Sequence, residues 1–148
     1  MLKILSMLLL LSPLAFAEKN EMVPLRQYIE NQDNNIDLES LMYVNLRCIA
    51  LHQWIYSLMQ VRADMEPEKE AIKIVKENLT KLIDTAEVMY NSLIPENEHD
   101  FSNFIEVEII PMMENYQMES QRSWTNTGEY FNNYINDEID ICKRVANT

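Results

Sequence analysis

Residues 37–63 read DLESLMYVNLRCIALHQWIYSLMQVRA, a long segment without glycine or proline. Its apolar side chains recur every three or four positions, which predicts one side of a helix that packs against a core. These positions are Leu41, Val44, Cys48, Leu51, Ile55 and Leu58. Asp37 is a favourable N-cap residue, so we expect a helix from Asp37 to about Ala63.

Two further segments show the same apolar spacing, and prolines separate them. We expect a second helix at 66–94, because Glu66-Pro67 suits a first helical turn and the proline at 95 ends the pattern. A third helix should begin between residues 97 and 100 and end near residue 123. Pro111 lies inside it, which predicts a kink or a split at that point.

A fourth helix is expected to open at 126–129, where Asn-Thr-Gly-Glu resembles a cap with an acid at the third helical position. Four helices with short links predict an all-α fold, an antiparallel four-helix bundle over residues 37–148. Residues 18–36 are polar and form a lead segment, with one short helix expected between Pro24 and Asn31.

The first 17 residues have the pattern of a secretory signal peptide. Lys3 supplies a positive start, residues 4–11 read ILSMLLLL, and Ala15 and Ala17 form a small-residue cleavage site before Glu18. Eight apolar residues are too few to cross a bilayer as a helix, which needs roughly 20. We therefore expect a periplasmic or secreted protein without a transmembrane span.

Cys48 and Cys142 are the two cysteines of the chain, and both lie on expected inward faces. In an oxidising compartment this favours a structural disulfide over two separate buried thiols. The bond would close a loop of roughly 95 residues and make the first and last helices neighbours.

The 37–63 helix has a second apolar face that includes Tyr43, Arg47 and Trp54. A helix on the protein surface should be polar there. Either the lead segment, residues 18–36, packs over this face, or the three residues form an interface, because tyrosine, tryptophan and arginine are common anchors of protein contacts. If this helix is central, Arg47 should pair with an acid from a neighbouring helix.

Negative charge is concentrated in the second half of the chain. The protein has 12 Lys and Arg against 24 Asp and Glu, and no basic residue lies between Lys81 and Arg122. Either these acids mainly keep the protein soluble, or they form a one-signed surface that attracts a basic protein or peptide and repels nucleic acid. The candidate interface acids are Glu106, Glu108, Glu114 and Glu119. This pattern predicts an exported binding protein of the kind that acts as an inhibitor, immunity partner or assembly factor.

Motifs for catalysis are scarce. Gly128 is the single glycine, so the sequence has no phosphate-binding loop, dinucleotide fingerprint or nucleophile elbow. We expect no cofactor and favour binding over catalysis, although residues from separate helices could still converge. The alternative is a small-ligand or copper carrier that uses the bundle interior or the thioethers of Met112, Met113 and Met118. The sequence leaves the oligomeric state open.

Overall fold

The computed structural model describes residues 22–32, 36–60, 66–94 and 100–148, and within these ranges the chain is helical and contains no strand. This confirms the predicted all-α class. The expected cleavage site at Ala15, Ala17 and Glu18 lies outside the described residues. The helices are α1 (Leu25–Glu30), α2 (Leu38–Gln60), α3 (Glu66–Leu93), α4 (Phe101–Thr127) and α5 (Asn133–Val145).

Side-chain caps start two of the long helices. The Asp37 carboxylate accepts a hydrogen bond from the Ser40 backbone N–H at 2.7 Å, as expected of an N-cap residue. The Asp100 carboxylate accepts one from Asn103 N–H at 3.1 Å and starts α4. Pro111 does not split α4, which runs through it as one element. Met112 and Tyr116, one and five residues after Pro111, are buried and hold the helix against the core.

The predicted start of the last helix is wrong. Gly128 has φ 76° and ends α4, and its N–H donates to the Trp124 carbonyl at 2.9 Å. Glycine tolerates this left-handed conformation and is therefore a common residue after a helix C-terminus. The cap of α5 is Asn132, whose side chain accepts from Ile135 N–H at 2.9 Å.

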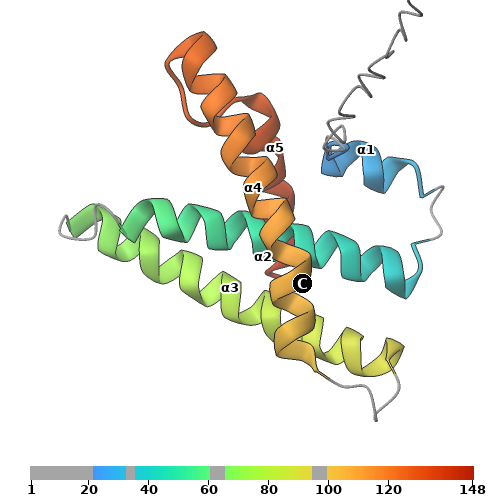
Figure 1. The fold of residues 1–148 in the computed structure, drawn as a ribbon. Coiled ribbons are helices and arrows are strands. Elements are labelled where there is room, and N and C mark those ends of the chain that lie inside the picture. The colour runs from blue at the N-terminus through green and yellow to red at the C-terminus, as the bar shows by residue number, and fades with distance from the viewer. Residues whose placement is uncertain (1–21, 33–35, 61–65, 95–99) are drawn as a thin grey trace, which may run out of the picture.

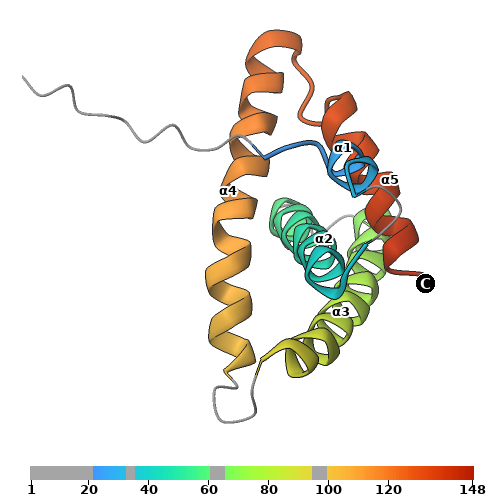
Figure 2. The same cartoon turned by 90° about the vertical axis from the view of Figure 1, so that its right-hand side faces the viewer.

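α2 is the central helix, and the others pack around it. In Figure 2 it is seen nearly end-on, with α4 on one side and α3, α5 and α1 around the rest. Its residues 44–52 are all buried, which explains why two of its faces are apolar. Leu41 and Leu58, near its two ends, are exposed although the spacing placed them on the core face. α4 crosses α2 steeply in Figure 1, so the antiparallel four-helix arrangement is not confirmed.

A disulfide joins α2 to α5, as predicted. Cys48 and Cys142 are bonded, their Cα atoms are 5.2 Å apart, and both side chains are fully buried. The bond spans 94 positions of sequence and makes the first and last long helices neighbours. None of the described helices is long and apolar enough to span a membrane.

Candidate functional site

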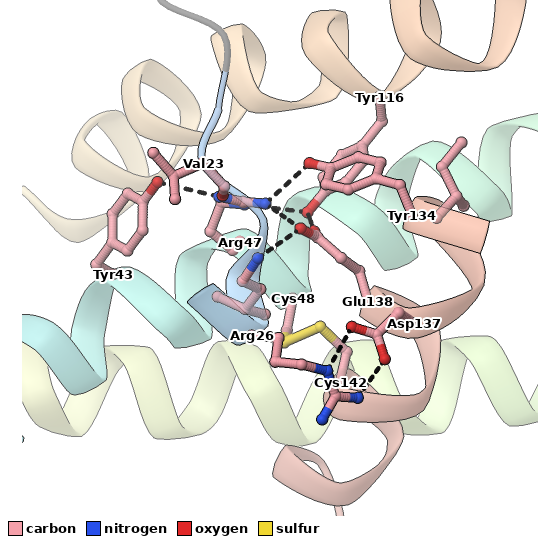
Figure 3. A network of polar contacts seen from close by, with 12 residues as sticks. Val23, Arg26, Tyr43, Arg47, Cys48, Tyr116, Tyr134, Asp137, Glu138 and Cys142 are labelled. Carbon is pink, nitrogen blue, oxygen red and sulfur yellow. Dashed lines mark hydrogen bonds and ion pairs between the residues drawn. A yellow bond between two sulfur atoms is a disulfide. The ribbon is translucent and has the colours of Figure 1, made fainter. Parts of the chain in front are cut away.

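A buried ion pair lies at the meeting point of α2, α4 and α5 (Figure 3). Arg47 of α2 and Glu138 of α5 are 0% and 1% exposed, and the Arg47 guanidinium donates to the Glu138 carboxylate. Arg47 also donates to the hydroxyl groups of Tyr116 and Tyr134, each at 3.1 Å. The Tyr116 hydroxyl in turn donates to the second carboxylate oxygen of Glu138. The opposite charges of Arg47 and Glu138 neutralise each other, and the tyrosine hydroxyls satisfy further hydrogen bonds of both groups.

The same ion pair binds the main chain of the lead segment. Arg47 Nη1 donates to the Val23 carbonyl at 3.0 Å and to the Tyr43 hydroxyl at 3.1 Å. Leu25 is the first residue of α1, so no carbonyl of its own helix accepts its backbone N–H. This N–H donates instead to Glu138 Oε1 at 2.9 Å. Leu25 itself is fully buried. Residues 22–32 of the lead segment thus pack over the second apolar face of α2, which was one of the two expected arrangements.

The other expectation, an interface formed by Tyr43, Arg47 and Trp54, is contradicted by burial. Arg47 is inside the ion pair, and Trp54 is 4% exposed. The Trp54 ring stacks on Tyr116 at a centroid distance of 6.1 Å and meets the edge of Phe131 at 5.8 Å. Tyr43 is half-buried, with its ring 4.5 Å from that of Tyr28 in α1. Arg47 and Trp54 are therefore enclosed within the fold and do not form an exposed interface with Tyr43.

Burial and charge change the acidity of this cluster. Loss of water raises the pKa of Tyr116 and Tyr134 above the usual value, and the Glu138 carboxylate raises both further. Burial alone would lower the pKa of Arg47, but the oxygens of Tyr116, Glu138 and Tyr134 more than offset this and raise it. At neutral pH the tyrosines are hydrogen-bond donors and Arg47 is a cation. The hydrogen bonds of this cluster hold α1, α4 and α5 against α2.

By fixing Tyr116, the cluster also fixes which side of α4 faces outward. Met112, Tyr116 and Ser120 are buried against the core. Successive residues turn by about 100° around a helix, so positions such as Ile110 and Glu114 lie on the opposite side. We call this side the α4 outer face and define it as Glu106, Val107, Ile110, Glu114 and Met118. All five are exposed, and Val107, Ile110 and Met118 are 58%, 45% and 38% accessible.

The four predicted interface acids do not lie on one surface. Glu106 and Glu114 belong to the α4 outer face. Glu108 is exposed but lies on another side of the helix, roughly 120° from Glu114. Glu119 points toward α5 and accepts from Asn132 Nδ2 at 2.7 Å, as well as from Arg122 at 3.2 Å. The candidate surface is therefore narrower than the sequence indicated, and it gains exposed apolar residues that charge counting did not identify.

The three candidate copper ligands point in different directions. Met112 belongs to the core, Met113 is half-buried, and Met118 is on the α4 outer face. Around the helix axis they are separated by roughly 100° to 140°, so their sulfur atoms do not converge. The described part of the chain also lacks a cluster of three His, Cys, Asp or Glu side chains placed to hold a metal ion.

Glu138 is the important residue that the sequence reasoning missed. It lies three positions after Ile135 and four before Cys142, which are both on the apolar stripe of α5. An acid inside such a stripe is a signal for a buried partner of opposite charge. The sequence also offered no indication that Tyr116 would contact Arg47. No family model matches the chain, and no curated protein or solved structure shows significant similarity to it.

Proposed function

We propose that this protein is an exported binding protein whose α4 outer face docks a basic, partly apolar protein or peptide. The observation that carries the proposal is the composition of that face, which combines two carboxylates with three exposed apolar side chains. A basic amphipathic partner would bury the apolar groups and pair with the acids. Opposite charge would also speed the encounter between the two molecules.

The surroundings of the face support this choice of partner. The chain has no Lys or Arg between residues 81 and 122, so the whole first half of α4 is free of positive charge. Glu87, Asp100 and Glu108 add exposed carboxylates on α3 and α4. An acidic partner or a nucleic acid would be repelled by this field.

Rigidity supports a role in recognition. The inner side of α4 is held by the Tyr116 contacts with Arg47 and Glu138, and α5 is held by the disulfide. A face carried on a fixed helix loses little conformational freedom when a partner binds, which favours affinity. An inhibitor, immunity partner or assembly factor would use a surface of this kind.

We also propose that the protein acts outside the cytoplasm, in the periplasm or the extracellular medium. Two features support this location: the signal-peptide pattern of residues 1–17 and the disulfide between Cys48 and Cys142. Structural disulfides persist in oxidising compartments and are rare in the cytoplasm.

The experiment is a cross-linking capture from the exported fraction of the cells that make the protein, at low and at high salt. Wild-type protein is compared with Glu106→Gln/Glu114→Gln and with Val107→Ser/Ile110→Ser. We expect wild type to capture a basic polypeptide at low salt. Both α4 variants should capture much less of this polypeptide. High salt should release it, because dissolved ions screen the attraction between opposite charges.

The matched control is Glu70→Gln/Glu77→Gln on α3, which removes the same number of exposed charges from another helix. This variant should capture the polypeptide as wild type does. If it loses binding as severely as the α4 variants, general charge is responsible and the α4 outer face is not the site. Equal capture by all variants would also refute the proposal.

A further inference from the structure

A cavity of about 350 Å³ lies between the described start of the lead segment, α4 and α5. Its apolar lining comes from all three elements: Met22 and Pro24, then Met118, then Tyr134. Figure 2 shows residues 22–24 passing beside α4 on the way to α1. Pro24 and Met118 are exposed, and Met22 and Tyr134 are only half-buried. A group that approaches the surface can therefore reach the lining of this cavity.

The cavity adjoins the α4 outer face, because Met118 belongs to both. Asn115 and Arg122, which also line the cavity, lie roughly 40° to 60° from Met118 around the helix axis, on the same side. Met118 follows Val107 by about three turns, or roughly 16 Å, along α4. The exposed apolar row of the outer face thus ends at the cavity. A partner helix that covers this row would carry a side chain to the mouth of the cavity.

The buried ion pair fixes two walls of the cavity. The Tyr134 hydroxyl accepts a hydrogen bond from Arg47 at 3.1 Å, which holds this tyrosine in place. Arg47 also donates to the Val23 carbonyl at 3.0 Å and so positions the neighbouring Pro24 (Figure 3). A site that is formed before its ligand arrives loses little conformational freedom on binding, which favours affinity.

The lining favours an aromatic ring over an aliphatic chain. Met22 and Met118 carry thioether groups, which make favourable contacts with aromatic rings. Tyr134 supplies a ring of its own, and pairs of aromatic rings gain more than the burial of their area. The volume lies near the lower end of the range for ligand pockets, about 300–1,000 Å³, which suits one side chain better than a large ligand.

The polar part of the lining favours a neutral group over a charged one. It consists of Asn115, Glu119 and Arg122. The Glu119 carboxylate already pairs with the Arg122 guanidinium at 3.2 Å, so a lysine or arginine of the partner would meet a cation here. Tyrosine has an apolar ring and a neutral hydroxyl that can donate and accept hydrogen bonds, and it is a common anchor of protein contacts.

We infer that this cavity receives one tyrosine side chain of the partner and is the anchor point of the docking site. The inference rests on the function proposed above and adds to it an aromatic residue at one end of the partner's apolar stripe. The docked partner is then held in two ways. Its basic residues pair with Glu106 and Glu114, and its tyrosine ring fills the cavity.

The first test uses phenol, which has the ring and hydroxyl of tyrosine, and cyclohexanol, which has the same skeleton without the aromatic ring. NMR spectra of the full mature chain with labelled methionine methyl groups follow both titrations. Phenol should move the signals of Met22 and Met118 and leave that of Met112, a core residue, unchanged. Its affinity should be at least about five times that of cyclohexanol.

The second test links the cavity to docking through two synthetic peptides. Each is a basic amphipathic helix of leucine, lysine and alanine, about 16 residues long, which is enough to cover the apolar row. The two differ only in a tyrosine or a leucine at one end of the apolar stripe. Titration calorimetry should show the tyrosine peptide binding at least about five times more tightly. Glu106→Gln/Glu114→Gln should weaken both peptides by similar factors, because it changes the outer face and not the cavity.

A variant that fills the cavity should remove the preference for tyrosine. Asn115→Trp places a large ring at the cavity wall, so both peptides should bind with equal affinity and phenol should no longer move the Met22 signal. The matched control is Thr80→Trp on α3. Both substitutions remove a side-chain hydrogen bond to the carbonyl one turn earlier, of 2.9 Å from Asn115 and 3.0 Å from Thr80. Thr80→Trp should keep the preference, and circular dichroism checks that both variants are folded.

Failure of this inference is distinguishable from failure of the docking proposal. Absence of phenol binding at millimolar concentration, or phenol shifts away from Met22 and Met118, would overturn the inference alone. Equal affinity of wild type for the two peptides would also overturn it, while weaker binding of both to Glu106→Gln/Glu114→Gln would still support the outer face. If phenol binds and neither peptide does, the outer face is not a docking surface, and the cavity takes a free aromatic molecule in place of a partner's side chain.

Discussion

Arg47 and Asn45 lie two residues apart on α2, and both are buried, yet their surroundings differ in kind. Arg47 donates to a carboxylate, three tyrosine hydroxyls and a backbone carbonyl, which come from the lead segment, α4, α5 and α2 itself. Asn45 donates one hydrogen bond to α3, and its oxygen accepts none from the residues that the structure describes. Both side chains are enclosed by the fold, but only Arg47 has all of its polar atoms paired.

The difference shows that burial alone does not tell whether a polar side chain is structural. The Arg47 guanidinium is fully buried, and its hydrogen bonds hold three other segments in place. The Asn45 amide is held on one side only, by its hydrogen bond to α3. The predictions below test whether the two sides of α2 differ as strongly in energy as they do in geometry.

The largest effect is expected when the ion pair loses one partner. Glu138→Gln leaves the Arg47 cation buried beside neutral groups, and we expect a loss of about 3–5 kcal/mol in the free energy of unfolding. Urea denaturation followed by circular dichroism measures it. The matched control is Asp137→Asn, the next residue, whose pairing with Arg26 is on the surface and should matter little. Similar small losses for both variants would contradict the assigned importance of the buried pair.

Removing the disulfide should have the second largest effect. Cys48→Ala/Cys142→Ala frees α5 from α2 at a point one residue from Arg47 and one turn from Glu138. We expect a loss of about 2–5 kcal/mol, because the unfolded chain gains the freedom that a long closed loop denies it. Thermal unfolding of wild type with and without a reducing agent provides the control. A loss below that range would mean that the polar cluster alone keeps α5 in place.

High pH should destabilise the Arg47 side of α2 through its tyrosines. The pKa values of Tyr116 and Tyr134 are raised in the folded protein above the usual value of 10.0, so they stay protonated there. The unfolded chain loses these protons above about pH 10 and is favoured, by at most about 1.4 kcal/mol per pH unit for each tyrosine.

Phenolate absorbance during an alkaline titration checks this expectation. Tyr116 and Tyr134 should ionise only when circular dichroism shows unfolding. In Tyr116→Phe that late group should shrink to one. Ionisation of all seven tyrosines before unfolding would show that the cluster is open to water.

The smallest effect is expected on the Asn45 side. Asn45→Ala removes one hydrogen bond to Leu82 but also removes an unpaired buried oxygen, so the two changes partly cancel. We expect a loss of at most about 1.5 kcal/mol in urea denaturation. Asn78→Ala, at a buried amide on α3, gives a comparison within the same interface. A loss as large as that of Glu138→Gln would show that Asn45 is as essential to the fold as the ion pair.

Much of the architecture was predictable because it depends on local signals. Asp37 caps α2 because a carboxylate accepts the free N–H groups of a first turn, and apolar spacing located the long helices. The two cysteines identified the α2–α5 contact, because the expected export of the chain favoured a disulfide between them. Gly128 was misassigned because the same short polar residues occur at both ends of helices, and only the left-handed conformation distinguishes a C-terminus.

The candidate site was harder to predict because it depends on angles between helices. Spacing indicated that Arg47 lies on an apolar face, but not that Glu138 would meet it 91 positions later. Glu106, Glu108, Glu114 and Glu119 form one group in sequence, whereas the 100° turn per residue and the contact with Asn132 separate them. The unpaired oxygen of Asn45 depends on the three-dimensional packing of α2 against α3 and α5.

The contact between Leu25 and Glu138 has a consequence for the order in which the chain can mature. The two residues are 113 positions apart, so the first helix gains its buried partner only after nearly all of the chain has been made. If the chain is threaded through a membrane from its N-terminus, the lead segment reaches the far side long before α5 does. The native hydrogen bond and the native disulfide must both wait for the last helix, and a polypeptide arrested during translocation has neither.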